Sequence, residues 1–287
     1  MIGFVVLHYS IKTISNTIDC INSINEKFSN VQKSIVVVEN GSNDQSYETL
    51  LSYSKILNFK LLRSVNNLGF ARGNNLGVKY LMKFSPQFYI VMNNDIIIKN
   101  FDYQRLRYLH KTYNFSAFGP RIISANNYDQ NPVQKVVKGK IVPITFSILK
   151  HRLLLSFIGN LLTRIIHIID MLRFNKNLHK NDEILVNKPL FGAFIVFSRE
   201  YVDYSQGNIF YPDTFMFLEE DILYYLLRKQ GRITLIDYRF EVYHLEDAST
   251  NSVFLTPENK RNFKVSNIIE SLLVFKKLIK ERTLWKV

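Results

Sequence analysis

The first hundred residues alternate between apolar runs and segments with helical spacing. The runs, rich in Val, Ile, Leu and Phe, lie at 4–9, 34–40, 59–64 and 87–95. Between the first two, apolar residues recur at the period of a helix, at Ile14, Ile18 and Ile21. Strands that alternate with helices form right-handed βαβ units, and parallel strands are buried on both faces, hence their uninterrupted apolar character. The pattern therefore predicts an α/β fold.

Polar residues stand where each predicted strand ends. The chain places Tyr9 after the first strand, Glu39 at the end of the second, Asn67 after the third and Asp95 at the end of the fourth. In such sheets the carboxyl ends of the strands meet at one edge, where ligands bind. A buried carboxylate such as Asp95 has to be paired, bound to a metal or placed at the mouth of a site. Each of these residues alone would suit a loop or turn, but four polar residues at the same edge of the sheet favour a binding cleft.

A second acidic group opens a predicted helix in the later half of the chain. Glu219, Glu220 and Asp221 precede an apolar helical stripe that ends at Gly231. Acidic residues in a first turn are stabilised by the helix dipole, so a simple charged N-terminus is one interpretation. The functional alternative is that one carboxylate accepts a proton from a substrate hydroxyl.

Composition and charge exclude several classes of protein. The 287 residues are 47% hydrophobic and 21% charged, which is typical of a globular chain and not of a disordered one. The single cysteine, Cys20, excludes an internal disulfide framework and zinc fingers, and it fits a reducing compartment.

The net charge of +13 favours acidic partners, namely nucleic acid, an anionic membrane or phosphorylated substrates, although it also suits a basic solubilising surface. The segment 1–10 lacks the basic region of a signal peptide.

The segment 150–176 is apolar between basic flanks. Its polar residues form one narrow stripe at helical spacing: Ser156, Asn160, Thr163, His167 and Asp170. Arg164 lies near its middle, which argues against a membrane-spanning helix. A wide apolar face with basic flanks suits a helix in the membrane interface. The alternative is a helix that packs on the domain or on a dimer partner.

Four motifs, in order, resemble those of glycosyltransferase family 2, and most closely its rhamnosyltransferase-like branch. They are VVVENGSNDQS, NNLGFARGNNLG, YIVMNND and FLEEDILYYLLRKQG, within residues 3–125 and 188–250. The resemblance implies an inverting enzyme with a GT-A fold, a Rossmann-like, mostly parallel sheet flanked by helices. We expect one domain over 1–287: a nucleotide-sugar-binding half (1–125), a basic amphipathic helical insert (140–185), an acceptor and catalytic half (188–250) and a C-terminal helix (258–281).

The resemblance also assigns a donor site. The residues that it implies are Tyr9, Glu39, Asn40, Asn67, Arg72, Gly73, Asn93 and Asn94. Glu39 stands where the family usually has an aspartate that contacts the imide of a pyrimidine base, and it is one methylene longer. Arg72 can pair with phosphate as a planar fork.

A metal and a catalytic base follow from the same resemblance. Asp95 takes the last position of the family's D-x-D motif, whose carboxylate holds Mg²⁺ or Mn²⁺ across the diphosphate, and Asn93 replaces the first aspartate. By the same resemblance His244 is a further metal ligand or a contact to the diphosphate, and the alternative is a structural histidine. Within the family's acidic pair, Glu219 and Glu220, the second member is the base, and Asp221 is the base if the register shifts by one.

The expected function is hexosyl or rhamnosyl transfer from a nucleotide-diphospho-sugar to a growing surface polysaccharide or lipid-linked glycan in a bacterium. The enzyme would be cytoplasmic and peripheral at the inner face of the cell membrane, with an anionic membrane surface and a homodimer as possible partners. A nucleic-acid-binding α/β protein is the second hypothesis, but the acidic rim opposes it, because carboxylates repel phosphate unless a metal intervenes. An inactive glycosyltransferase-like binding subunit is the third, kept open by Asn93 and Glu39.

Overall fold

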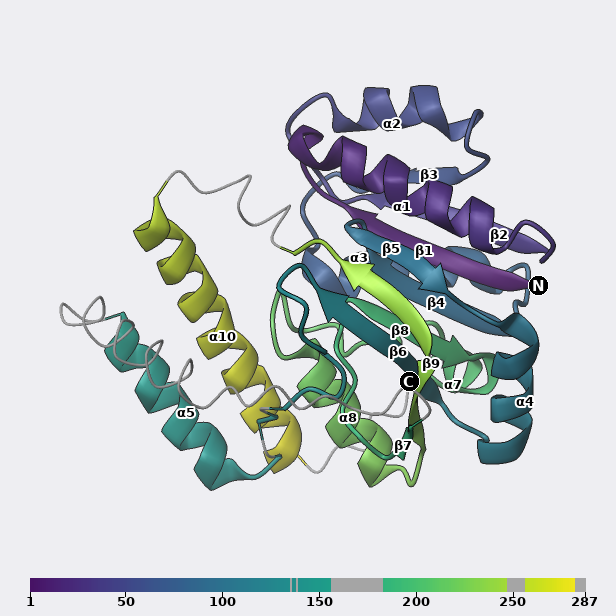
Figure 1. The fold of residues 1–287 in the computed structure, drawn as a ribbon. Helices are drawn as coiled ribbons and strands as arrows, with labels where there is room; N and C mark the ends of the chain where they lie inside the picture. The colour runs from purple at the N-terminus through teal and green to yellow at the C-terminus, as the bar shows by residue number, and fades with distance from the viewer. Residues whose placement is uncertain (135, 138, 156–182, 247–255, 282–287) are drawn as a thin grey trace.

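The computed structural model describes residues 1–134, 136–137, 139–155, 183–246 and 256–281 (Figure 1). The strands are β1 Ile2–His8, β2 Lys33–Glu39, β3 Lys60–Arg63, β4 Phe88–Asn93, β5 Ile96–Asn100, β6 Ala117–Ser124, β7 Ile184–Val186, β8 Phe194–Ser198 and β9 Thr234–His244. The helices are η1 Ile11–Thr13, α1 Ile14–Lys27, α2 Ser46–Ser54, α3 Gly69–Met82, α4 Tyr103–Tyr113, α5 Ile141–Leu154, α7 Arg199–Tyr204, α8 Glu219–Lys229 and α10 Pro257–Lys280.

One sheet contains all of the described strands, in the order β3-β2-β1-β4-β8-β6-β9-β5, with β7 paired to β9. The strands β3, β2, β1 and β4 run parallel to one another, which confirms the prediction for the first hundred residues. β8 then runs antiparallel to both β4 and β6, and β9 is parallel to β6 but antiparallel to β5. The predicted fold class, a Rossmann-like sheet flanked by helices, is confirmed, with the antiparallel pairings confined to its second half.

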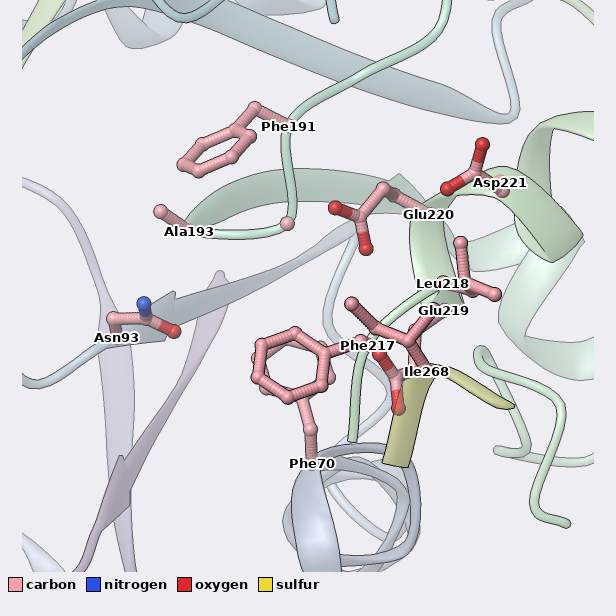
Figure 2. Close-up of a pocket in the computed structure, with 11 residues that line it drawn as sticks. Phe70, Asn93, Phe191, Ala193, Phe217, Leu218, Glu219, Glu220, Asp221 and Ile268 are labelled. Atoms are coloured by element: carbon pink, nitrogen blue, oxygen red, sulfur yellow. The ribbon is translucent and has the colours of Figure 1, made fainter. Parts of the chain in front are cut away.

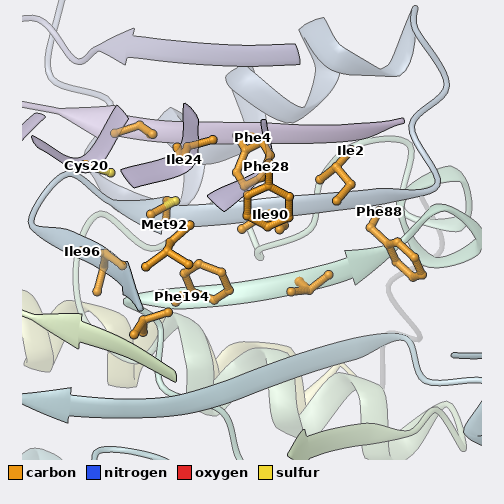
Figure 3. Close-up of a cluster of buried hydrophobic side chains, with 14 of the residues drawn as sticks. Ile2, Phe4, Cys20, Ile24, Phe28, Phe88, Ile90, Met92, Ile96 and Phe194 are labelled. Carbon is orange, nitrogen blue, oxygen red and sulfur yellow. The ribbon is translucent and has the colours of Figure 1, made fainter. Parts of the chain in front are cut away.

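Helices cover both faces of this sheet, and β1 explains why its strands are apolar throughout. Phe4 and Val6 pack with α1, α2 and α4 in one buried cluster, whereas Val5 packs with α3, α7 and α8 in another. Figure 3 shows the first cluster, in which the free thiol of Cys20 lies among aliphatic and aromatic side chains. Because successive strand residues point to opposite faces, a strand with two covered faces has to be apolar at every position.

A third cluster joins α8 to α5 and α10, which lie side by side at one end of the molecule (Figure 1). The predicted C-terminal helix is present as α10, and the predicted helical insert contains α5 but ends in a strand, because residues 184–186 form β7. Most of the predicted interfacial segment, residues 156–176, lies outside the described residues. Among the residues that the structure describes, no helix is long and apolar enough to cross a membrane.

Candidate functional site

The carboxyl ends of β1, β2 and β4 meet at one edge of the sheet. His8 pairs in register with Glu39 of β2, and Leu7 pairs with Asn93 of β4. This is the edge at which the sequence predicted a cleft. A pocket of about 290 Å³ opens there, beside Asn93. Its other lining residues come from α3, the segment before β8, the start of α8 and α10: Phe70, Phe191, Gly192, Ala193, Phe217, Leu218, Glu219, Glu220, Asp221 and Ile268.

The walls of this pocket are apolar and its polar groups are few. Figure 2 shows Phe70 and Phe191 on two sides, Asn93 at the end of β4, and the carboxylate of Glu220 directed into the space between them. Gly192 lies opposite Glu220, since a Cβ added at Gly192 would be 3.7 Å from Glu220 Oε2. An apolar pocket with a few convergent polar groups is the usual form of a small-molecule site.

The three acidic residues of α8 point in different directions. The Oδ1 atom of Asp221 accepts a hydrogen bond of 2.6 Å from the backbone N–H of Val137. Glu219 is buried, and its carboxylate accepts a hydrogen bond from Thr214. Glu220 is thus the member of the group whose carboxylate faces the centre of the pocket.

The backbone just before these acids has an uncommon conformation. Phe217 and Leu218, which both line the pocket, have φ angles of +71° and +68°. Side chains other than glycine rarely adopt this left-handed region, and such residues cluster at binding and active sites. The tight turn sets the direction in which α8 begins.

Burial changes the acidity of all three carboxyl groups. Removal from water raises the pKa of Glu219 to about 8, and the neighbouring Glu220 adds to this rise. Burial likewise raises the pKa of Asp221 to about 7 and raises the pKa of Glu220. Perturbed carboxyl groups that meet in a cleft are typical of acid–base chemistry.

The two predicted metal ligands are brought together from distant parts of the chain. Asp95 lies in the turn between β4 and β5, and His244 ends β9, which pairs with β5 so that His244 is opposite Ile96. The distance between Asp95 Oδ1 and His244 Nε2 is 3.4 Å, and both side chains are nearly buried. Asp95 Oδ1 has no hydrogen-bond partner.

A chain of hydrogen bonds determines which nitrogen of His244 carries a hydrogen. Gln130 Nε2 donates to Glu246 Oε1 over 2.7 Å, and Gln130 Oε1 lies 2.9 Å from His244 Nδ1. Because an ionised carboxylate only accepts hydrogen bonds, the amide has to present its NH₂ to Glu246 and its oxygen to His244. His244 Nδ1 then carries a hydrogen, and in the neutral ring the lone pair of Nε2 faces an oxygen of Asp95 that has no hydrogen-bond partner.

This arrangement fits a divalent cation. Two lone pairs that face each other repel, and either a proton on Nε2 or a metal cation between the two atoms removes this repulsion. Carboxylate and imidazole are both ligands that Mn²⁺ accepts. In the described part of the chain no group of three or more His, Cys, Asp and Glu side chains could hold a metal. A cation at Asp95 and His244 would therefore draw its remaining ligands from substrate oxygens or water.

Several predicted donor residues hold the rim together. Asn40 donates to Asn67 Oδ1 over 3.1 Å, and both asparagines bond the backbone at the start of α3. The amide of Asn94 donates to hydroxyl groups at the start of α1. Gly73 allows α3 to approach β1, because a Cβ there would lie 2.6 Å from Leu7 Cδ1. These four positions shape the rim, while Asn93 lines the pocket itself.

The other predicted donor residues lie outside the pocket lining. Glu39 is fully buried; its Oε1 accepts from the backbone N–H of Ser42 over 2.7 Å, and its Oε2 has no hydrogen-bond partner. Arg72 is exposed and donates to the carbonyl of Pro212 over 2.7 Å. Tyr9 is half-buried beside the end of β1.

The sequence interpretation missed several residues of this site. Gln130 and Glu246 carry no local signal, since only the pairing of β9 with its neighbours brings them to His244. Ile268 reaches the pocket from α10, a helix that the sequence predicted but did not assign to the site. His8 is a buried residue at the end of β1, where burial lowers its pKa to about 4 and Thr17 Oγ1 lies 2.8 Å from its Nδ1.

The class that this fold defines is that of the GT-A glycosyltransferases. The chain superposes on GalNAc-T7, solved with UDP, GalNAc and Mn²⁺, with a TM-score of 0.56 and 14% identity, over 90% of this chain and 49% of that one. It superposes on S. aureus TarS 1-349 in complex with UDP-GlcNAc with a TM-score of 0.51 and 13% identity, over 95% of this chain and 66% of that one. At these identities the likeness concerns the fold.

The chain belongs to glycosyl transferase family 2, whose family model matches residues 11–177. It is also 29% identical over 97 residues to the low-salt glycan biosynthesis hexosyltransferase Agl10 of Haloferax volcanii. That match spans 33% of this chain and 30% of the relative, so most of the relative's length has no counterpart in the match.

Proposed function

We propose that this protein transfers a sugar from a nucleotide-diphospho-sugar to a hydroxyl group of a glycan acceptor, with inversion at the anomeric carbon. The observation that carries the proposal is the pocket at the carboxyl edge of the sheet, into which Glu220 points and which Asn93 borders (Figure 2). Membership in glycosyl transferase family 2 supports it. So do the UDP and UDP-GlcNAc bound in the GalNAc-T7 and TarS structures of the same fold.

In this proposal Glu220 is the general base. The acceptor oxygen forms a bond to the anomeric carbon, the bond from that carbon to the diphosphate oxygen breaks, and the nucleoside diphosphate leaves with the electron pair. Glu220 takes the proton of the attacking hydroxyl, which requires its ionised form. The raised pKa of Glu220 makes it a stronger base than an exposed glutamate. Asp221 is the less suitable candidate, because it is bonded to Val137 outside the pocket.

Asp95 and His244 would hold Mg²⁺ or Mn²⁺, which supplies positive charge to the leaving diphosphate. The donor would lie along the ends of β1, β2 and β4, with the base near Glu39, whose second carboxylate oxygen has no hydrogen-bond partner. The acceptor sugar would enter between Phe70 and Phe191, where aromatic faces suit the apolar face of a sugar ring.

We propose in addition a donor sugar, an acceptor and a cellular location. The donor sugar would be a hexose or rhamnose, and the acceptor a growing surface polysaccharide or a lipid-linked glycan in a bacterium. We place residues 1–125 in the donor half and 188–250 in the acceptor half. The enzyme would work as a peripheral protein at the cytoplasmic face of the cell membrane, alone or as a homodimer.

Nucleotide binding with and without Mn²⁺ tests the proposal directly. A thermal-shift screen should show stabilisation by UDP or dTDP that grows when Mn²⁺ is added. Asp95→Asn keeps the shape of the side chain and should abolish only the metal-dependent part. The proposal is wrong if no nucleoside diphosphate stabilises the wild-type protein. The metal assignment is wrong if Asp95→Asn retains the full effect of Mn²⁺.

A further inference from the structure

Helix α5 carries apolar side chains on two opposite faces. On one face, Ile144 and Ile148 are buried against α8 and α10. The other face is open: Val142 is 65% exposed, Phe146 70%, Leu149 52% and Leu153 57%. The last four residues are spaced by four, three and four positions, so they form one stripe along the helix.

Two cations border this stripe. Residues of a helix are about 100° apart around its axis, which places Lys150 about 80° to one side of Val142 and Arg152 about 80° to the other. Both cations are exposed. Helix α5 contains neither Asp nor Glu. The α5 surface, defined as Val142, Phe146, Leu149 and Leu153 with Lys150 and Arg152, is thus an exposed apolar strip with a positive charge on each side.

We propose that the α5 surface docks on an anionic phospholipid bilayer, with the helix lying in the plane of the interface. The apolar strip would enter the boundary between headgroups and acyl chains, as amphipathic interfacial helices do. Lys150 and Arg152 would extend along its edges to the lipid phosphates, since their long stems tolerate an apolar surrounding while the charged ends stay in water. The net charge of +13 adds a longer-range attraction to the same surface.

Charge favours the bilayer over a second copy of the chain. In a two-fold symmetric contact through α5, the strip of one copy would face that of the other, and Lys150 and Arg152 of both copies would lie at the same interface. The helix has no acidic residue that could compensate for this repulsion. An anionic bilayer supplies the missing negative charge, and it accepts an apolar strip of any shape.

The α5 surface is connected to the pocket through α10. Helix α10 packs on α5, and its Ile268 lines the pocket beside Glu220. Docking would therefore hold the pocket close to the bilayer, where a lipid-linked acceptor would lie; this last step rests on the proposed function. Docking itself depends only on the α5 surface and can be tested without any sugar transfer.

Vesicle sedimentation tests the docking. The full chain should sediment with vesicles of phosphatidylcholine and phosphatidylglycerol, less at high salt, and little with phosphatidylcholine alone. Phe146→Ser combined with Leu149→Ser should lower the partition coefficient by at least about tenfold, because the apolar contacts are lost. Lys150→Glu combined with Arg152→Glu should remove the dependence on phosphatidylglycerol. The control is Ile56→Ser, which should bind like wild type. Ile56 is an apolar residue of 76% exposure just after α2, and α2 lies far from α5 in Figure 1.

A fluorescent label gives a second readout that does not depend on loss of binding. The only native cysteine, Cys20, is fully buried, so Phe146→Cys and Ile56→Cys can each be labelled selectively. The emission of an environment-sensitive dye at position 146 should shift to shorter wavelength on addition of anionic vesicles, and that of the dye at position 56 should not.

Equal responses at both positions, or no sedimentation of the wild type, would overturn the proposal. So would a wild-type dimer in solution that Phe146→Ser converts to a monomer, since a second copy would then cover the surface. Nucleotide-dependent stabilisation in the same preparation separates this failure from a failure of the proposed function.

Discussion

The relay from Glu246 through Gln130 to His244 makes a quantitative prediction about metal binding. Gln130→Met keeps the length of the side chain but removes both the acceptor for His244 Nδ1, at 2.9 Å, and the donor to Glu246, at 2.7 Å. Nothing then holds the hydrogen on Nδ1, and the ring is free to place its N–H toward Asp95. In that tautomer Nε2 has no lone pair for a metal.

The size of the effect follows from the contacts of the ring. Outer partners of metal-bound histidines typically contribute about 10–100-fold to metal affinity. A hydrogen bond between neutral groups contributes about 0.5–1.5 kcal/mol, or about 2–13-fold, which reaches only the lower end of that range. His244 also packs against Phe191, with ring centroids 5.8 Å apart, and this contact restricts how far the ring can turn. We therefore expect a loss of about tenfold in Mn²⁺ affinity, with little change in thermal stability.

Titration calorimetry of Mn²⁺ in the presence of UDP measures this directly, and Gln134→Met provides the matched control. Gln134 is exposed on the same segment and should be replaceable without effect. Asp95→Asn should weaken Mn²⁺ binding more strongly than Gln130→Met, because it removes the charged ligand itself. If Asp95→Asn loses the metal while Gln130→Met binds it as tightly as wild type, the relay does not hold His244 and the tautomer argument is wrong.

Three further predictions concern the carboxylates. Glu220→Gln should lower sugar transfer at saturating donor by about 10²–10⁴-fold while nucleotide affinity stays unchanged; an inactive Asp221→Asn beside an active Glu220→Gln would show that Asp221 is the base. Glu219 has a pKa of about 8 when folded against an ordinary value of 4.5, so the folded state holds more protons between these pH values and its stability falls as pH rises. Glu219→Gln should therefore raise the melting temperature more near pH 8 than near pH 5, and equal gains would contradict the burial of this charge. Glu39→Ala should weaken nucleotide affinity in calorimetry without changing its dependence on Mn²⁺, and unchanged affinity would place the base elsewhere.

Much of the first half of the fold could be predicted from the sequence, for a physical reason. The strands β1, β2 and β4 are buried along most of their length, so each is a continuous apolar run, and β1, β2 and β3 are each followed along the chain by a helix. The second half has no such order. β6, β8 and β9 pair with one another and with β4 and β5 across long stretches of chain, and apolar character alone does not select those partners.

The residues of the site could likewise be predicted only where a local pattern or the family resemblance marks them. Asp95 is conspicuous in the sequence because a carboxylate interrupts an apolar run, and the family resemblance supplies His244. Gln130 and Glu246 are ordinary polar residues in loops, and their roles depend on a pairing between β6 and β9 that no local pattern encodes. A site built from strand ends is predictable strand by strand, whereas the contacts that orient its side chains depend on the completed sheet.

The packing of α8 explains why three adjacent acids can have three different roles. Ile222 and Leu226 are buried in the cluster with α5 and α10, and Leu223 and Leu227 are buried in the cluster beneath the sheet, so the helix is held on both sides. A helix held in this way cannot rotate, and successive side chains are about 100° apart, so the three neighbouring carboxylates point in different directions and Glu220 is the one directed into the centre of the pocket (Figure 2). The other two carboxyl groups are buried, and burial raises the pKa of both, although the hydrogen bonds from Thr214 to Glu219 and from Val137 to Asp221 act in the opposite direction. A change in the packing of α5 or α10 would therefore act on the direction of Glu220 through Ile222 and Leu226, without touching the pocket itself.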